Sequence, residues 1–381
     1  MIIFNKKYLI MLLSILTLSF LLVACGGGDE EEGTDEGTTE EDTGTEDSDS
    51  EGSEDTAADF EEQEWRFITE EYQGEVQYVY AEEFAKRIDE KTDGAITVTP
   101  YEFGALGSEE DQAQLIIQGG AELAIMSPGF TGGQVPDGQI FSLHYFFPAD
   151  PAETQEVLTN SEALNTDLRA KYEEHNISPL AYWTEGSMMW TSNVGIESPS
   201  DWEGLNQRVQ ASPLMQQTYD AYGATVQNIS WGELYTALER GTVDAQENPA
   251  FFIYSADFYQ VQDALTISNH NNYVAMTTVS TSWYEGLNEQ EQQLIDETVE
   301  EMQDWIFEEQ ERQNQEGIEA IENDEEYPTE IIELTEDQIA EFKAVAEPVH
   351  EQYRNNEITE SEIDSDLYDK LESEIEEVSG E

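Results

Sequence analysis

Residues 204–249 alternate short β-rich runs with amphipathic helices, and this order restricts the fold more than any other feature of the chain. The runs NQRVQA, ATVQNI and TVDAQENP are typical of strands, and the segments between them are typical of helices that end at Gly223 and Gly241. Strands joined through helices predict a largely parallel α/β sheet. Ligands bind beyond the carboxyl ends of such strands, where Trp231 and the ENPAFF segment fall.

The rest of the chain continues the alternation of strands and helices. Strands are predicted at 64–71, 95–103, 121–127 and 329–334, and helices at 74–94, 108–117, 150–158, 288–322 and from 335 onward. The helix at 288–322 is unusually long, and only Gly317 interrupts its pattern. The acidic residues from Asn355 onward are predicted to be frayed.

The N-terminus has the pattern of an export signal. Lys6 and Lys7 precede an apolar run that ends before Cys25, which predicts a signal peptide at 1–24. LLVAC resembles the bacterial lipobox, so Cys25 is predicted to carry a lipid; the alternative, an uncleaved anchor, has barely enough apolar residues. Residues 25–64 are predicted to be a disordered tether, because they contain 19 acidic residues and no Lys or Arg.

The charge balance limits the partners. The chain has a net charge of −72, and residues 65–381 alone have −55, so the folded surface itself is acidic. Such a surface repels nucleic acid and anionic membranes. High salt, which screens self-repulsion, is one explanation, and an alkaline habitat is another. The single Cys excludes a disulfide framework within the chain.

No catalytic motif is present in the sequence. His144, His175, His270 and His350 have no metal-ligand spacing, and there is no Gly-rich phosphate loop or nucleophile elbow. Carboxylates are so frequent that pairs of them carry no information about catalysis. These observations predict a protein that is not an enzyme and has no cofactor and no metal.

Arg208 is an unusual cation. Between residues 172 and 311 the only other Lys or Arg is Arg240, which precedes Gly241 and complements the end of a helix. Arg208 lies in a strand shortly before a helix begins, where the helix dipole disfavours a cation. A guanidinium fits a carboxylate bidentately, so Arg208 is either a structural ion pair or a ligand anchor. Trp231 and the two Phe of ENPAFF similarly belong either to the core or to a pocket.

The segment WGELYTALERGTVDAQENP resembles the signature of the solute-binding proteins of tripartite ATP-independent periplasmic (TRAP) transporters, with Ala245 replacing the usual Gly. The resemblance implies a two-lobed α/β fold like that of periplasmic binding proteins, with a long spanning helix and an interlobe cleft. It places lobe I at 65–185 and 274–313, and lobe II at 186–273 and 314–381. It also implies delivery of a solute to membrane permease subunits, and the predicted lipid on Cys25 would anchor the receptor to the outer face of the cell membrane.

The same resemblance assigns the ligand-binding positions. The family Arg, which ordinarily binds a substrate carboxylate, maps onto Arg208. Many members carry a second Arg where this chain has Met188, so a strongly anionic substrate is disfavoured. WRFITEEYQGEVQ, SPGFTGGQVPDGQIF and SPLMQQTY are similar to the subgroup that binds ectoine and hydroxyectoine. The carry-over predicts a pocket lined by Glu71, Phe130, Met188, Arg208, Trp231, Asn248, Phe252 and Tyr273.

Two of these positions depart from the subgroup: Phe252 stands where Trp is expected, and Tyr273 where Phe is expected. The choice among ectoine, hydroxyectoine and another small zwitterion therefore stays open. A TRAP receptor for a different small carboxylate, such as a 2-oxo acid, is the second interpretation. An acidic structural or calcium-binding surface protein is the third.

Overall fold

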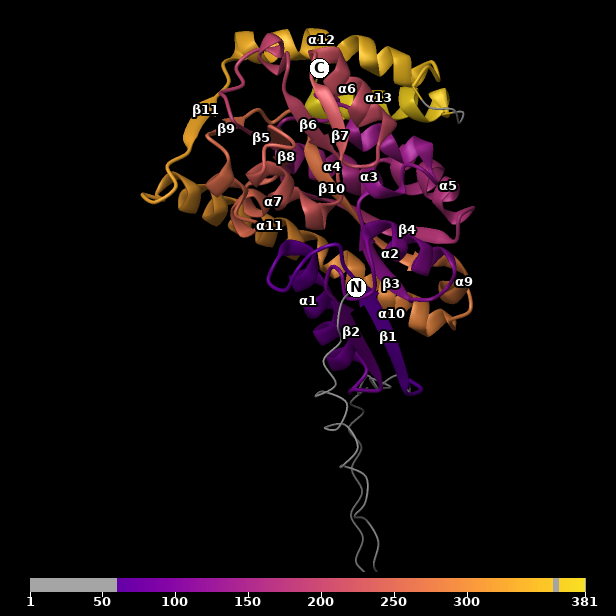
Figure 1. Ribbon diagram of the computed structural model, residues 1–381. Helices are drawn as coiled ribbons and strands as arrows, with labels where there is room; N and C mark the ends of the chain where they lie inside the picture. Colours follow the sequence, from indigo (N-terminus) through magenta and orange to yellow (C-terminus); the bar gives the residue numbers. More distant parts are fainter. Residues whose placement is uncertain (1–59, 359–362, 381) are drawn as a thin grey trace, which may run out of the picture. The chain divides into compact units, whose positions relative to one another are not determined.

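The computed structural model describes residues 60–358 and 363–380, which lie in the compact unit Ala57–Glu381 (Figure 1). The predicted signal peptide, Cys25 and most of the tether lie outside the described residues. The first strand begins at Gln63, inside the last residues assigned to the tether. Within the described ranges, every helix is too short or too polar to cross a membrane.

The first sheet has five strands in the order β2-β1-β3-β10-β4. β1 pairs in parallel with β2 and β3, whereas β10 pairs antiparallel with β3 and β4. The carboxyl ends of β1 and β3 therefore meet at one edge. The strands are β1 (Gln63–Ile68), β2 (Ile96–Tyr101), β3 (Leu123–Met126), β4 (Ile177–Ser187) and β10 (Asn272–Ser280).

The second sheet has six strands in the order β11-β9-β5-β8-β6-β7. β6 pairs in parallel with β7 and β8, which confirms the predicted βαβαβ unit, and β5 is antiparallel to β8 and β9. The carboxyl ends of β6 and β8 share one edge. The strands are β5 (Met189–Ser192), β6 (Asn206–Val209), β7 (Thr225–Asn228), β8 (Ala245–Asn248), β9 (Ala264–Ile267) and β11 (Glu330–Glu333).

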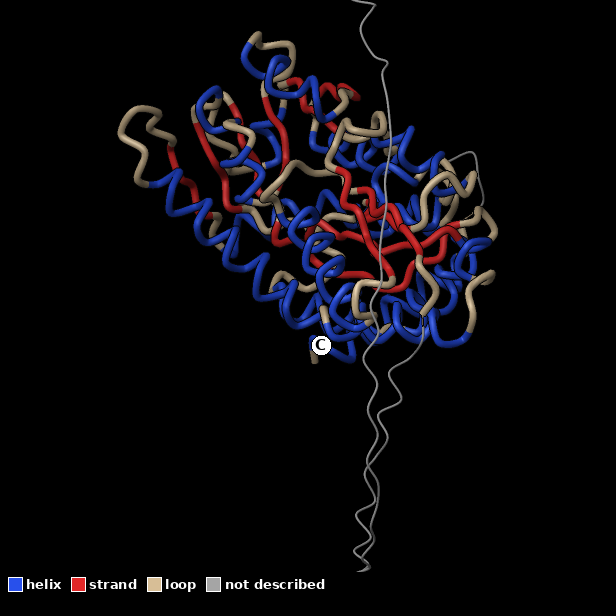
Figure 2. Tube along the Cα trace, turned by 90° about the horizontal axis from the view of Figure 1, so that it is seen from below, coloured by secondary structure: helices blue, strands red, loops and turns tan. Residues whose placement is uncertain are grey.

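Helices pack against both sheets, and Figure 2 shows the strands as two groups with helices around them. Four helices begin at capping residues, Ser108, Ser212, Asn288 and Thr335, whose side chains accept backbone N–H groups of the first turn. The α-helices are α1 (Val76–Lys91), α2 (Glu109–Ile117), α3 (Pro128–Thr131), α4 (Pro151–Asn160), α5 (Arg169–Glu173), α6 (Pro213–Tyr222), α7 (Trp231–Glu239), α8 (Ala250–Ser255), α9 (Thr281–Tyr284), α10 (Glu289–Glu301), α11 (Gln303–Glu322), α12 (Glu336–Arg354) and α13 (Ser365–Ser379).

Two neighbouring chain segments connect the sheets. β4 of the first sheet continues into β5 of the second through Met188, and β9 of the second sheet runs into β10 of the first through residues 268–271. The backbone N–H of Met188 donates to the oxygen of Asn271 at 2.8 Å, and the Ser268 hydroxyl donates to the oxygen of Met188 at 3.4 Å. Movement of one sheet relative to the other must therefore involve this hydrogen-bonded pair of segments.

The long helix predicted at 288–322 is divided, so this prediction is wrong in detail. α10 ends at Glu301 and α11 begins at Gln303, whereas Gly317 lies inside α11 without interrupting it. The division falls at Met302, whose side chain is fully buried and whose N–H bonds to the carbonyl of Val299. The break allows α10 to pack against α1 while α11 packs against α8.

The prediction that the chain is frayed after Asn355 is also wrong. Residues Ser365–Ser379 form α13, which begins at the capping side chain of Asp364. Its buried residues are spaced by one helical turn, and α13 packs against α4: Leu367, Tyr368, Leu371 and Ile375. The abundance of acidic residues concealed this apolar stripe, because those acids occupy the solvent-facing side of the helix.

Gly317 marks the place where α11 crosses α8 at backbone contact. A Cβ atom on Gly317 would lie 2.9 Å from the carbonyl oxygen of Ala250 and 3.1 Å from the Cα of Phe251. Both are backbone atoms, so neither can rotate away. The residue is therefore required for the close approach of the spanning helix to the segment that follows β8.

We predict that Gly317→Ala destabilises the protein by about 1–2 kcal/mol. Alanine in a helix interior ordinarily stabilises by roughly 0.5–1 kcal/mol, but here overpacking, which costs about 1–3 kcal/mol, should dominate. Urea unfolding measures the change. Gly133→Ala is the control, because Gly133 is exposed and its Cβ would have no neighbour within 4 Å. Stabilisation by Gly317→Ala would show that the helices are not in backbone contact.

Candidate functional site

The candidate site lies where the carboxyl-end edges of the two sheets face each other. From the first sheet, Ser127–Gly129 follow β3, and from the second sheet Gln210 follows β6; a Cβ on Gly129 would overlap the side chain of Gln210. The Gln210 amide also donates to the hydroxyl of Tyr273 at 3.5 Å. Residues from both sheets thus enclose a cavity of about 30 Å³ that is lined by Ser127, Gly129, Met188, Gln210 and Tyr273, among others.

Arg208 is a buried cation without an ionic partner. It lies on β6 and is only 3% exposed. Its Nε–H donates to the carbonyl of Ile229 at 2.9 Å, but its Nη2 has no hydrogen-bond partner. Within the described ranges no carboxylate oxygen lies within 4 Å of this guanidinium. Burial lowers the pKa of Arg208, and the negative charge of neighbouring Glu109 opposes part of that shift.

Glu71 presents a carboxyl group from the first sheet. It follows β1 and is fully buried. Its Oε2 accepts the backbone N–H of Gln77 at 2.6 Å, whereas its Oε1 has no partner. Burial raises the pKa of Glu71 well above its ordinary value, and the neighbouring carboxyl of Glu185 raises it further. The two sheets therefore contribute one guanidinium and one carboxyl group, each with a polar atom left unbonded.

Three aromatic residues form a continuous row. The rings of Trp231 and Phe252 are 4.9 Å apart, and those of Phe252 and Tyr273 are 5.7 Å apart. Trp231 begins α7. Its backbone N–H donates to Oε1 of Glu109 at 3.3 Å, so α7 beside the second sheet contacts α2 beside the first. The row offers ring faces to a ligand. Phe130, on α3, is buried but takes part in no ring contact recorded among the described residues.

Asn248 and Met188 occupy adjacent strand ends. Asn248 ends β8, is almost fully buried, and donates through its amide to the side-chain oxygen of Gln246. Met188 lies between β4 and β5 and lines the cavity together with Glu247. An apolar thioether therefore stands where a second guanidinium would contribute positive charge to the cavity.

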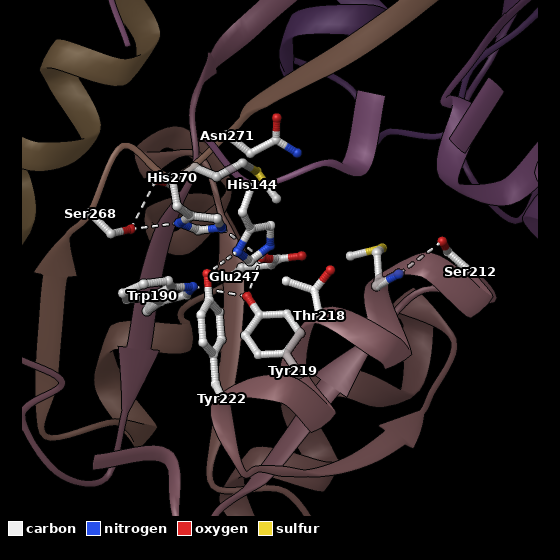
Figure 3. Close-up of polar contacts among 12 residues, drawn as sticks. His144, Trp190, Ser212, Thr218, Tyr219, Tyr222, Glu247, Ser268, His270 and Asn271 are labelled. Atoms are coloured by element: carbon white, nitrogen blue, oxygen red, sulfur yellow. Dashed lines mark hydrogen bonds and ion pairs between the residues drawn. The ribbon is translucent and has the colours of Figure 1, made fainter. Parts of the chain in front are cut away.

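A polar cluster that the sequence did not predict borders the same cavity (Figure 3). His270 Nε2 is 2.7 Å from Oε2 of Glu247, and His144 Nε2 is 3.7 Å from the same oxygen. The hydroxyl of Tyr219 donates to this carboxylate as well. Burial lowers the pKa of both imidazoles and raises that of Glu247, so the histidines are neutral near pH 7.

These two histidines and Glu247 are the group of described residues that could hold a metal ion. Their remaining ring nitrogens bond to hydroxyls: His270 Nδ1 lies 2.6 Å from Ser268 Oγ, and His144 Nδ1 lies 3.1 Å from the oxygen of Tyr222. The cluster is thus hydrogen-bonded as it stands. The absence of metal-ligand spacing in the sequence did not reveal this pair, because spacing cannot detect residues that only the tertiary fold brings together.

Four acidic residues of the site were also missed. Glu70, Glu109, Glu185 and Glu247 are each buried, Glu247 lines the cavity, and burial raises the pKa of each. In a chain with 86 acidic residues, nothing local distinguishes these from the acids of the surface. Sequence position could have indicated two of them, because Glu70 and Glu247 lie at the ends of predicted strands within the segments that the sequence pattern singled out.

Two α/β lobes with a polar cavity between facing sheet edges define the class of extracytoplasmic solute-binding proteins. The family model described as bacterial extracellular solute-binding protein, family 7 (DctP), matches residues 67–356. The chain belongs to this family, the solute receptors of TRAP transporters. Its members are substrate-binding receptors.

Three comparisons specify the relationship. The ectoine-binding periplasmic protein TeaA of Halomonas elongata is 34% identical over 76% of this chain and 84% of its own length. The ectoine/5-hydroxyectoine-binding protein UehA of Ruegeria pomeroyi is 33% identical over 61% of this chain and 68% of its own. A high-resolution structure of the periplasmic ectoine-binding protein from the TeaABC TRAP transporter of H. elongata superposes with a TM-score of 0.78 and 32% identity, covering 82% of this chain and 99% of that chain.

We predict that Arg208→Met does not lower the free energy of unfolding of the ligand-free protein by more than about 1 kcal/mol. Removing one partner of a buried ion pair costs roughly 3–5 kcal/mol, whereas replacing an unpaired buried cation by an apolar side chain relieves its desolvation. Urea unfolding without ligand measures the difference, with Arg240→Met at the exposed end of α7 as the control. A loss of several kcal/mol would instead identify Arg208 as a structural ion pair.

Proposed function

We propose that this receptor captures ectoine or hydroxyectoine between its two lobes and delivers it to the membrane permease of a TRAP transporter. One observation carries the proposal: a buried guanidinium without a carboxylate partner comes from the second sheet, a buried carboxyl with an unbonded oxygen comes from the first, and Tyr273 lies near both. Ectoine is a small ring with a carboxylate and a delocalised amidinium. Arg208 would bind its carboxylate, and Glu71 would accept the amidinium N–H groups.

The aromatic row supports a cationic ring. Contacts between a cation and aromatic faces contribute about 0.5–2 kcal/mol each when water is excluded. Trp231, Phe252 and Tyr273 provide three adjacent rings, and Asn248 could bond either polar end of the ligand. In this assignment Phe130 and Met188 complete the wall of the pocket. The folded part of the chain has a net charge of −55, which neither attracts nor repels a zwitterion as a whole.

Another small carboxylate is the second candidate. Arg208 alone would suffice to bind a 2-oxo acid or another monocarboxylate. A dicarboxylate or sugar acid is disfavoured, because Arg208 is the only Lys or Arg in the predicted pocket set and Met188 replaces the second Arg. The names of the two ectoine-binding relatives favour the first candidate.

We predict that ectoine or hydroxyectoine raises the melting temperature more than succinate, a sialic-acid-type sugar acid or a 2-oxo acid does. A ligand at 100 times its dissociation constant stabilises the native state by about 2.7 kcal/mol. Calorimetry should then give one site per chain. Arg208→Met should abolish binding, since a ligand carboxylate would lose its charged partner at a cost of roughly 2–5 kcal/mol.

The control for Arg208→Met is Arg240→Met, which should bind like the original protein. A larger shift with a dicarboxylate or sugar acid, together with none for ectoine, would refute the ectoine assignment and leave the receptor class unchanged. Unaltered affinity in Arg208→Met would exclude Arg208 as the anchor.

We further propose that Cys25 is lipidated and that the acidic tether holds the receptor at the outer face of the cell membrane. The support is the lipobox-like LLVAC at the end of an export signal. Mass spectrometry of the native N-terminus should find a lipid-modified Cys25 as the first residue. A mature N-terminus elsewhere, or an intact signal peptide, would refute the anchor.

A further inference from the structure

Glu185 lies beside Glu71 and has a similar environment. It is the ninth residue of β4 and is fully buried. Its Oε1 accepts a hydrogen bond from the side-chain amide of Gln77 at 2.9 Å. Among the described residues, its Oε2 has no hydrogen-bond donor. Gln77 therefore holds both carboxyls, Glu71 through its backbone N–H and Glu185 through its side chain. The two carboxyl groups also contact each other.

No cation neutralises this pair. Among the described residues, no Lys, Arg or His nitrogen lies within 4 Å of either carboxyl. The other titratable groups around it are Glu70 and Glu75 from the loop before α1, and Tyr273 from β10. α11 contributes the amide of Asn314, which donates to the backbone oxygen of Glu185 at 2.7 Å. Two adjacent buried carboxylates cannot both stay ionised, so the pair retains a proton between them.

We propose that Glu185 is a second carboxylate of the cation-binding subsite, and that the cationic end of the ligand replaces the proton shared by Glu71 and Glu185. This inference rests on the proposed function, because it requires a ligand with a cationic group. The proton passes to bulk water as the lobes close around the ligand. The two carboxylates then surround the amidinium, while Arg208 holds the carboxylate at the other end.

Binding is therefore linked to pH. Burial raises the pKa of Glu185 to about 7, and burial together with Glu185 raises the pKa of Glu71 well above its ordinary value, so the pair titrates as a unit in a pH range above that of ordinary carboxyls. Below this range the pair is protonated and must release a proton to bind a cation, so affinity rises with pH by up to about tenfold per unit. Above this range the proton is already lost, and affinity becomes independent of the pair.

Calorimetry with ectoine in buffers of different ionisation enthalpy measures the protons released. The original protein should release close to one proton per ligand at pH 5.5 and close to none at pH 8.5. Glu185→Gln should release almost none at either pH, because its amide donates permanently to Glu71 in place of the shared proton. Glu82→Gln, an exposed change of equal charge on α1, should behave like the original protein.

The outcomes separate this inference from the proposed function. Ectoine binding without proton release at pH 5.5 would overturn the role of the pair and leave the ectoine assignment intact. Failure of ectoine to bind at any pH, with binding of a monocarboxylate, would overturn both. The measurement on the original protein needs no variant, so it decides the question even if Glu185→Gln does not fold.

Discussion

This receptor is organised around ionisable side chains that are buried without a partner of opposite charge. A buried ion without a partner is unfavourable, so a fold retains one only where something else completes it. Arg208 on β6 and Glu71 after β1 each keep a polar atom unbonded at the junction of the two sheets. In the proposed function a zwitterion completes both groups, because its two charged ends match a guanidinium and a carboxyl that come from different sheets.

Because of the way in which the two sheets are connected, a ligand that bonds to both Arg208 and Glu71 would also close the lobes. The two crossing segments are hydrogen-bonded at Met188 and Asn271, and α11 approaches α8 at backbone contact through Gly317. Rigid sheets on a narrow connection can rotate as bodies. The hydrogen bond from the backbone N–H of Trp231 to Glu109 joins the two lobes. A ligand that bridges Arg208 and Glu71 would add to these contacts and favour the closed form.

Local signals in the sequence predicted most of the elements, and long-range contacts account for what it missed. The βαβαβ unit, the helix caps and the position of Arg208 follow from periodicity and capping residues within short windows. The break at Met302 depends on what α10 and α11 pack against, and α13 was concealed by its acidic face. Glu185 meets Glu71 and Gln77, which lie more than 100 residues away in the chain. No local pattern encodes such a contact.

A crystal structure of the protein grown with ectoine tests most directly whether the two unpaired charges define the ligand. The ligand carboxylate should lie within hydrogen-bond distance of the Arg208 guanidinium, and the amidinium should lie against Glu71 and Glu185 with the ring on the aromatic row. A ligand bound in the reverse orientation, or an Arg208 paired with Glu109 while the ligand lies elsewhere, would contradict this arrangement.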